Sequence, residues 1–192
     1  MDVRVFTRLI AIAVPVAVAL AGCGGSSGPR SAAPSRTAVE AAFHGSPPAL
    51  AAIHGQGNRI LDGGVAAFRT RLRSLRGHPV IVNLWGSWCE PCQSEFPVFQ
   101  RAAVRYGRRI AFLGVDVHDK ASAASAFLKR FPVTYPSYFD PDRRIEASLQ
   151  TLEGTPQTFF FNARGREEFD HGGPYTTLAS LGRDIHTYLG VS

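Results

Sequence analysis

Residues 79–97 have the sequence PVIVNLWGSWCEPCQSEFP, in which a short apolar segment is followed by two cysteines. The segment Pro79–Trp85 is rich in β-branched residues and almost wholly apolar, which is typical of a central strand buried on both faces. Residues Glu90–Tyr106 predict a helix, so Cys89 lies at the junction between strand and helix. Two cysteines separated by two residues at such a junction predict a redox pair.

The positions of the two cysteines predict different roles for them. The unpaired N–H groups and the dipole at a helix N-terminus favour a thiolate at Cys89. Cys92 lies one turn further along the helix, close enough to form a disulfide and less open to solvent. We therefore expect Cys89 to be the attacking nucleophile and Cys92 the resolving thiol. The intermediate is then a mixed disulfide between Cys89 and the substrate. Pro91 fits the first helical turn, where its missing N–H costs nothing.

Two other roles for the cysteine pair stay open. A C-x-x-C motif can be half of a zinc site, but the sequence has no second cysteine pair and no HExxH, and its histidines are dispersed. We therefore predict no metal site. An inert structural disulfide is the second alternative, and it leaves the neighbouring Trp88 and Pro91 unexplained. A peroxiredoxin would carry Thr or Ser three residues before its reactive cysteine, where this chain has Gly86.

The rest of the chain alternates between strand and helix patterns. Leu50–Ile53 and Arg59–Leu61 flank a Gly-rich turn and predict a short N-terminal hairpin. The apolar periodicity predicts helices at Gly63–Arg76, Glu90–Tyr106, Ala121–Phe131, Arg143–Leu149 and Thr176–Leu189, strands at Pro79–Trp85, Ile110–Val117 and Tyr135–Phe139, and a hairpin of Thr158–Asn162 with Glu167–His171. This order predicts an α/β fold with a mixed sheet covered by helices on both faces.

The N-terminal residues predict export from the cytoplasm. Residues 1–22 combine two arginines with the apolar run Leu9–Ala21, which is too short to cross a bilayer and is typical of a secretion signal. Residues 23–46 are rich in Gly, Ser, Pro and Ala and predict a flexible tether. Residues 47–192 are then the folded domain.

The end of the apolar run, Leu20–Cys23, resembles the lipobox of bacterial lipoproteins. In that family the cysteine is diacylated on its sulfur and becomes the new N-terminus. The resemblance implies that Cys23 is lipidated and that the domain is anchored to the outer face of the cell membrane, outside the cytoplasm. The alternative is ordinary cleavage after Ala21, which leaves Cys23 as a free thiol.

Composition and charge exclude several classes of protein. The chain has 192 residues, of which 45% are hydrophobic, so it is not disordered throughout. Its formal net charge of +6 comes almost entirely from arginines, which are scattered apart from a group in Arg69–Arg76. A solvated helix face explains that group, and no nucleic-acid motif accompanies it. We therefore expect no nucleic-acid partner.

Two motifs are similar to the thioredoxin-like TlpA/ResA family of extracytoplasmic thiol-disulfide oxidoreductases. The first is VNLWGSWCEPCQSEFP at residues 82–97, and the second is GTPQTFFFN at residues 154–162, followed by Gly165. The similarity covers roughly Pro47 to Leu189. It implies a thioredoxin-like fold, with a TlpA-type insertion in the long segment that contains Asp116 and Asp140.

The resemblance also implies roles for residues around the cysteines. Thr155 and Pro156 would form a cis-proline loop that packs against the disulfide and, together with Trp88 and Pro91, binds an extended substrate. Glu95 would be the family's acidic residue and relay a proton to or from the resolving cysteine. Its position three residues after that cysteine places it on the same helix face. Alternatively, Glu95 is an exposed residue that stabilises the start of the helix.

One position departs from thioredoxin itself, which has a buried Asp where this chain has Asn83. Because an amide cannot exchange a proton, that role has to pass to Glu95 or to water. The resemblance further implies a reductant of cysteine pairs in proteins such as apocytochrome c, supplied with electrons by a CcdA-like membrane protein. Glu90 agrees with that direction, because its charge opposes a thiolate at Cys89. No cofactor beyond the Cys89–Cys92 disulfide is expected.

Two other functions stay open at this point. The chain could be an oxidative folding catalyst for secreted proteins, in which case the Cys89–Cys92 pair would accumulate as the disulfide. It could also be a non-catalytic binding module that uses a thioredoxin scaffold to hold a partner.

Overall fold

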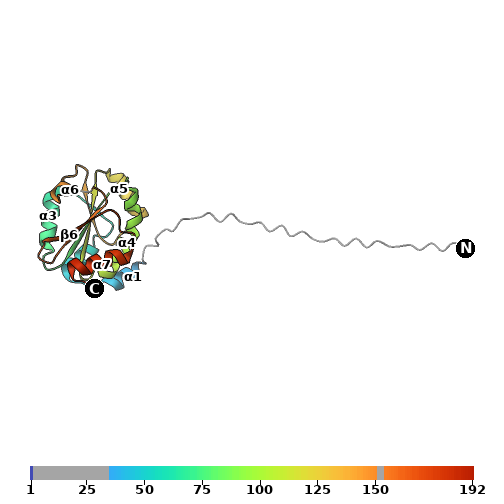
Figure 1. The fold of residues 1–192 in the computed structure, drawn as a ribbon, viewed down its shortest axis with the longest axis horizontal. Helices are drawn as coiled ribbons and strands as arrows, with labels where there is room; N and C mark the ends of the chain where they lie inside the picture. The colour runs from blue at the N-terminus through green and yellow to red at the C-terminus, as the bar shows by residue number, and fades with distance from the viewer. Residues whose placement is uncertain (2–34, 151–153) are drawn as a thin grey trace. The chain divides into compact units, whose positions relative to one another are not determined.

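The computed structural model describes Met1 and residues 35–150 and 154–192, which fold around one mixed sheet (Figure 1). The elements in chain order are α1 (Arg36–Phe43), α2 (Pro48–His54), β1 (Ile60–Leu61), α3 (Gly64–Ser74), β2 (Val80–Trp85), α4 (Glu90–Tyr106), β3 (Ala111–Val117), α5 (Ala121–Arg130), β4 (Ser137–Asp140), α6 (Arg144–Ser148), β5 (Gln157–Phe161), β6 (Glu167–Gly172) and α7 (Leu178–Leu189). No described helix is long and apolar enough to span a membrane.

The sheet has six strands in the order β1-β4-β3-β2-β5-β6. Strands β1, β4, β3 and β2 run parallel to one another, whereas β5 pairs antiparallel with β2 and β6 antiparallel with β5. All residues of β2 and β3 are buried, as expected for strands whose two faces are both covered by helices. Figure 1 shows α3 and α6 on one side of the sheet and α4 and α5 on the other.

This architecture confirms the predicted α/β class and the thioredoxin-like sheet covered on both faces. The segment between Asp116 and Asp140 forms the end of β3, helix α5 and strand β4, which is the extra strand–helix material implied by the family resemblance. Strand β4 inserts between β1 and β3, so the additional strand extends the parallel half of the sheet. The cysteine pair follows β2, near the middle of the sheet.

The predicted N-terminal hairpin is wrong. Residues Pro48–His54 form helix α2, with Pro48 at a first-turn position where its missing N–H is tolerated. Leu50 and Ile53 are both fully buried, and residues three apart share a face only in a helix. Strand β1 pairs instead with the distant β4, in the register Ile60 to Ser137.

The predicted tether extends too far towards the domain. Residues 36–43, which the sequence assigns to flexible chain, form helix α1, because the segment is rich in alanine and Ser35 caps it by accepting a hydrogen bond from the Ala38 N–H at 3.2 Å. The Phe43 ring stacks on His54 with 3.5 Å between ring centroids. Residues 2–34, which include the rest of the predicted signal segment, Cys23 and the remainder of the predicted tether, lie outside the described residues.

Candidate active site

The two cysteines occupy the first turn of α4 and are joined by a disulfide. Cys89 is the N-cap residue, and its Sγ accepts a hydrogen bond from the Cys92 N–H at 3.2 Å. The Cα atoms are 5.3 Å apart. Cys89 is 3% exposed whereas Cys92 is fully buried, so an incoming group meets Cys89 first. The backbone amides that open the helix favour a negative charge on the Cys89 sulfur when the pair is reduced.

Exposed side chains lie next to the disulfide on both sides of Cys89. Trp88 is 53% exposed although its indole N–H donates to the Val117 carbonyl at 3.1 Å. Pro91 is exposed in the first turn of α4. Gly86 allows this arrangement, because a Cβ at that position would come within 2.5 Å of the Trp88 ring. The molecule therefore presents an apolar rim beside its disulfide.

The second motif forms the loop before β5. The Thr155–Pro156 peptide bond is cis, as the family resemblance implies. Because Gln157 pairs with Leu84, this loop lies beside the end of β2, from which the cysteine loop also begins. The Pro156 carbonyl accepts a hydrogen bond from the Gly173 N–H at 2.9 Å, which ties the loop to the end of β6. The topology thus brings two motifs from distant parts of the chain to one end of the sheet.

Glu95 is fully buried in α4, one turn after Cys92, so the alternative of an exposed residue at the helix start is wrong. The Asn83 amide donates to Oε1 at 2.8 Å and the Tyr175 N–H donates to Oε2 at 3.2 Å. Burial raises the pKa of Glu95 to about 8, and these two hydrogen bonds only partly oppose the increase. The carboxyl is therefore predominantly protonated at neutral pH and close to its titration range.

Asn83 has a structural role that is visible only in the fold. It lies in the middle of β2 opposite Thr158 of β5, and its side chain points at Glu95 across the layer between sheet and helix. The amide holds one carboxyl oxygen of Glu95 but cannot take up its proton. The transfer of a proton role from position 83 to Glu95 or to water stays a prediction.

Sequence reasoning missed two contributors to the site. Tyr175 reaches Glu95 through its backbone N–H, for which the side-chain pattern contains no signal. Asp119 follows strand β3 and accepts hydrogen bonds from the loop before Cys89. A signal for Asp119 does exist, since polar residues that follow neighbouring parallel strands meet at one edge of a sheet.

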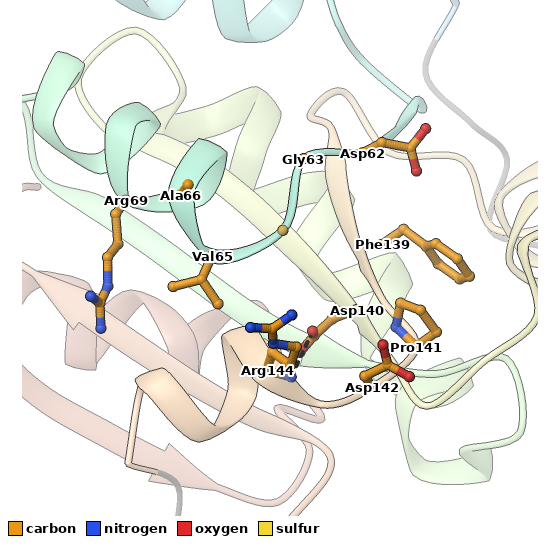
Figure 2. Close-up of a pocket in the computed structure, with 11 residues that line it drawn as sticks. Asp62, Gly63, Val65, Ala66, Arg69, Phe139, Asp140, Pro141, Asp142 and Arg144 are labelled. Atoms are coloured by element: carbon orange, nitrogen blue, oxygen red, sulfur yellow. Dashed lines mark hydrogen bonds between the residues drawn. The ribbon is translucent and has the colours of Figure 1, made fainter.

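The structure also contains a cavity that neither cysteine lines (Figure 2). It has a volume of about 600 Å³ and lies between the start of α3 and the residues after β4. Its charged lining residues are Asp62, Arg69, Asp140, Asp142 and Arg144, and none of the site residues described above lines it. Within the described part of the chain, no three His, Cys, Asp or Glu side chains are grouped so that they could hold a metal ion.

Comparison with known proteins supports the family resemblance that the two motifs indicate. A family model described as AhpC/TSA matches residues 65–166, more than half of the chain, including the cysteine pair, Glu95 and the cis-proline loop. The chain belongs to the AhpC/TSA family. This AhpC/TSA protein is 31% identical over 99 residues to the thiol-disulfide oxidoreductase ResA of Bacillus subtilis, a match that covers 51% of this chain and 55% of that protein. The resemblance noted in the sequence is thereby confirmed.

A further relative of this AhpC/TSA protein is the thiol:disulfide interchange protein DsbE of Pseudomonas fluorescens. The two are 34% identical over 92 residues, which cover 47% of this chain and 49% of the relative. The chain thus matches about half the length of these relatives.

Solved structures of other proteins share the fold of this chain. A DsbF homologue from Corynebacterium diphtheriae is 28% identical with a TM-score of 0.56, covering 60% of this chain and 75% of that chain. A thiol:disulfide interchange protein of the thioredoxin family from Chlorobium tepidum is 26% identical with a TM-score of 0.54, covering 62% and 84% of the two chains. The AhpC/TSA domain of this protein therefore has thioredoxin-like relatives in both sequence and structure.

Proposed function

We propose that this protein is a thiol-disulfide oxidoreductase that exchanges electrons with cysteine pairs of other proteins outside the cytoplasm. The observation that carries the proposal is the disulfide at the N-terminus of α4, with the buried Glu95 carboxyl one turn after Cys92. An inert structural disulfide would need neither the helix amides at its more accessible sulfur nor an acid that titrates near neutral pH. Relatives named ResA and DsbE support the same chemistry.

In the reductive direction, the Cys89 thiolate attacks one sulfur of a substrate disulfide. The substrate S–S bond breaks, its leaving sulfur takes the electron pair, and a mixed disulfide with Cys89 forms. Cys92 then loses its proton and attacks the Cys89 sulfur, which releases the substrate as a dithiol. The protein is left with the Cys89–Cys92 disulfide and two electrons fewer.

Glu95 takes part by moving the proton of Cys92. Its carboxylate accepts the proton as Cys92 attacks, and the resulting acid returns it when a donor dithiol reduces the disulfide again. The pKa of about 8 suits this exchange, because both forms of the carboxyl are accessible near neutral pH. The structure contains the oxidised pair, the stage at which this cycle leaves the proton on Glu95.

Trp88, Pro91 and the Thr155–Pro156 loop form the substrate-binding rim of this proposal. The exposed indole and pyrrolidine rings offer apolar contact on either side of Cys89. The cis-proline loop lies at the same end of the sheet and suits an extended segment of substrate backbone. No cofactor other than the disulfide takes part in this chemistry.

The proposed setting is the outer face of the cell membrane. Residues 1–22 act as the export signal, a diacylated Cys23 anchors the chain, and the residues that follow tether the domain. The direction is reductive, with apocytochrome c among the substrates and a CcdA-like membrane protein as the electron donor. Glu90, exposed beside Cys89, supports this direction because its charge disfavours the thiolate and so a strongly oxidising pair.

Turnover of insulin disulfides tests the activity. We expect the wild-type chain to reduce insulin with dithiothreitol as donor, and Cys89→Ser to lose that activity. Cys92→Ser should stall as a mixed disulfide with insulin, visible on a non-reducing gel as a covalent species that disappears when a reductant is added. Wild-type protein that fails to accelerate insulin reduction would support the binding-module alternative instead.

The equilibrium with a glutathione buffer tests the direction. A reductant should have a potential near that of thioredoxin, about −270 mV. A potential near −120 mV, the value typical of DsbA, would reverse the direction and favour the oxidative folding catalyst.

A further inference from the structure

The loop that precedes Cys89 is held by a carboxylate from a different part of the chain. Asp119 accepts a hydrogen bond from the Ser87 backbone N–H on Oδ2 at 2.6 Å. The Ser87 hydroxyl donates to the other oxygen, Oδ1, at 3.0 Å. Ser87 and Asp119 are separated by 32 positions in the sequence, so only the fold brings them together. A carboxylate that engages both a main-chain and a side-chain donor fixes position as well as orientation.

The same connection between β3 and α5 makes a second contact with this loop. The Val117 carbonyl accepts from the Trp88 indole N–H at 3.1 Å. Between the two anchoring residues, His118 has φ of 51°, which is uncommon for a residue other than glycine. This turn lets the Val117 carbonyl and the Asp119 carboxylate both accept hydrogen bonds from the cysteine loop. Residues Val117–Asp119 therefore form a clamp on Ser87 and Trp88.

Asp119 has no alternative structural task that explains these bonds. An aspartate just before a helix commonly caps it, but the N-cap of α5 is Lys120 and no side chain caps that helix. Besides the two bonds to Ser87, Asp119 accepts from the adjacent Lys120 N–H, at 2.7 Å, and interacts with the neighbouring Asp116 carboxyl. Its carboxylate is directed at the cysteine loop rather than at its own helix.

A buried acid lies next to this clamp. Asp116 is fully buried at the end of β3, opposite Trp85 of β2. Burial raises the pKa of Asp116 to about 8, helped by the charge of Asp119, by a hydrogen bond between the two side chains and by the charge of Asp140. At neutral pH Asp116 is therefore mainly protonated and uncharged.

We propose that Asp119 is a positioning residue of the redox reaction, which acts through Ser87 to hold the cysteine loop so that the Cys89 sulfur stays aligned with the amides of α4. The inference rests on the proposed thiol chemistry but not on any particular substrate. Because Cys89 is two residues after Ser87, displacement of Ser87 moves the sulfur relative to the helix N-terminus. That alignment is what favours the thiolate.

The pH dependence of Cys89 alkylation separates positioning from a simple charge effect. The full chain would be reduced and treated with iodoacetamide over a range of pH, and modification of Cys89 would be followed by mass spectrometry. If Asp119 positions the loop, Asp119→Asn should lower the alkylation rate at pH 7 about tenfold and move the midpoint of the profile to higher pH, since the amide replaces a charged acceptor. Removal of a nearby negative charge alone would have the opposite sign, because it favours the thiolate.

Ser87→Ala provides a milder variant that removes the hydroxyl bond and keeps the backbone bond. We expect it to slow alkylation two- to threefold, and the double variant to be no slower than Asp119→Asn alone, because both act on one contact. Asp142→Asn, an exposed aspartate at the same end of the sheet, is the matched control and should leave the profile unchanged.

An unchanged or accelerated rate in Asp119→Asn would overturn the proposal, as would strict additivity with Ser87→Ala. If Asp119→Asn fails to fold, Ser87→Ala decides the matter by the same readout. Iodoacetamide requires no protein substrate, so a wild-type chain that is alkylated readily but does not reduce insulin would contradict the proposed function and leave this inference standing.

Discussion

Cys92 and Glu95 lie one turn apart in α4, and both are completely buried. Their chemistry depends on what surrounds each of them. Cys92 is shielded behind the slightly exposed Cys89, which fits its assignment as the second thiol to react. Glu95 is enclosed between α4, β2 and the segment before α7, where two hydrogen-bond donors only partly compensate for the loss of water. The raised pKa allows this carboxyl to gain or lose a proton near neutral pH.

The burial of Glu95 predicts how stability changes with pH. An unfolded chain loses this proton near pH 4.5, whereas the folded protein keeps it until about pH 8. Between these values the folded state binds more protons, so the free energy of unfolding falls as pH rises, by up to about 1.4 kcal/mol per pH unit for one group. Asp116 contributes with the same sign. Glu95→Gln should flatten the slope, as measured by urea denaturation from pH 5 to pH 8.

Glu90→Gln serves as the control for that measurement, because Glu90 is an exposed carboxylate on the same helix. It should leave the pH dependence of the wild-type protein almost intact. Curves for Glu95→Gln and wild type that stay parallel across the whole range would contradict the assigned protonation of Glu95.

Among the elements, α4 links the chemistry to the core, and the N-terminal helices support its far end. The first turn of α4 contains the disulfide, and the following turns bury one face against the sheet. His54 of α2 hydrogen-bonds the Gly107 carbonyl at the C-terminal end of α4 at 2.9 Å. Burial lowers the pKa of His54, and Phe43 of α1 stacks on its ring. Helices α1 and α2 thus dock on the end of α4 remote from the cysteines.

Phe43→Ala tests the docking of α1. Loss of the half-buried ring and its stacking should lower the free energy of unfolding by about 1–2 kcal/mol. It should also accelerate amide exchange in α1 and α2 while leaving the rate of insulin reduction close to that of wild type, because α4 begins far from this contact. Hydrogen exchange read by mass spectrometry provides the measurement, with the exposed neighbour His44→Ala as control. Unaltered exchange in α1 would show that the stack does not hold this helix.

At the level of the whole molecule, the thioredoxin-like sheet collects chemistry from segments that are far apart in sequence. Strand β2 leads to the cysteines, β5 follows the cis-proline loop, and β3 leads to Asp119. The parallel pairing of β2 with β3 and the antiparallel pairing of β2 with β5 place these three connections at one end of the sheet. The described domain thus contains the residues that the proposed exchange chemistry needs.

Loss of the proposed lipid anchor at Cys23 should not affect the thiol-disulfide exchange. Cys23→Ser should move the protein from the membrane fraction to the soluble fraction of cells that express it, since no acyl chain can be attached. The released protein should reduce insulin at the wild-type rate, because the reacting groups all belong to the folded domain. Membrane fractionation followed by the insulin assay would check both parts, and a Cys23→Ser protein that stays with the membrane would exclude the lipid anchor.

Local patterns in the sequence were enough to predict the buried strand β2, the full extent of α4, the cysteine pair and most of the remaining helices and strands. These features depend on residues within a few positions of one another, so apolar periodicity and helix-terminus chemistry describe them well. Family resemblance added the cis-proline loop. Helix α2 was mistaken for a strand because a short apolar segment fits both periods until burial shows which residues share a face.

Only the tertiary structure revealed that Glu95 is buried and that it bonds to Asn83 and the Tyr175 backbone. It also revealed the hydrogen bonds between Asp119 and Ser87. The partners lie 12, 80 and 32 positions apart, and no periodicity connects residues at such separations. Whether a carboxyl is solvated or enclosed depends on which elements pack over it, and its proton affinity follows from that packing.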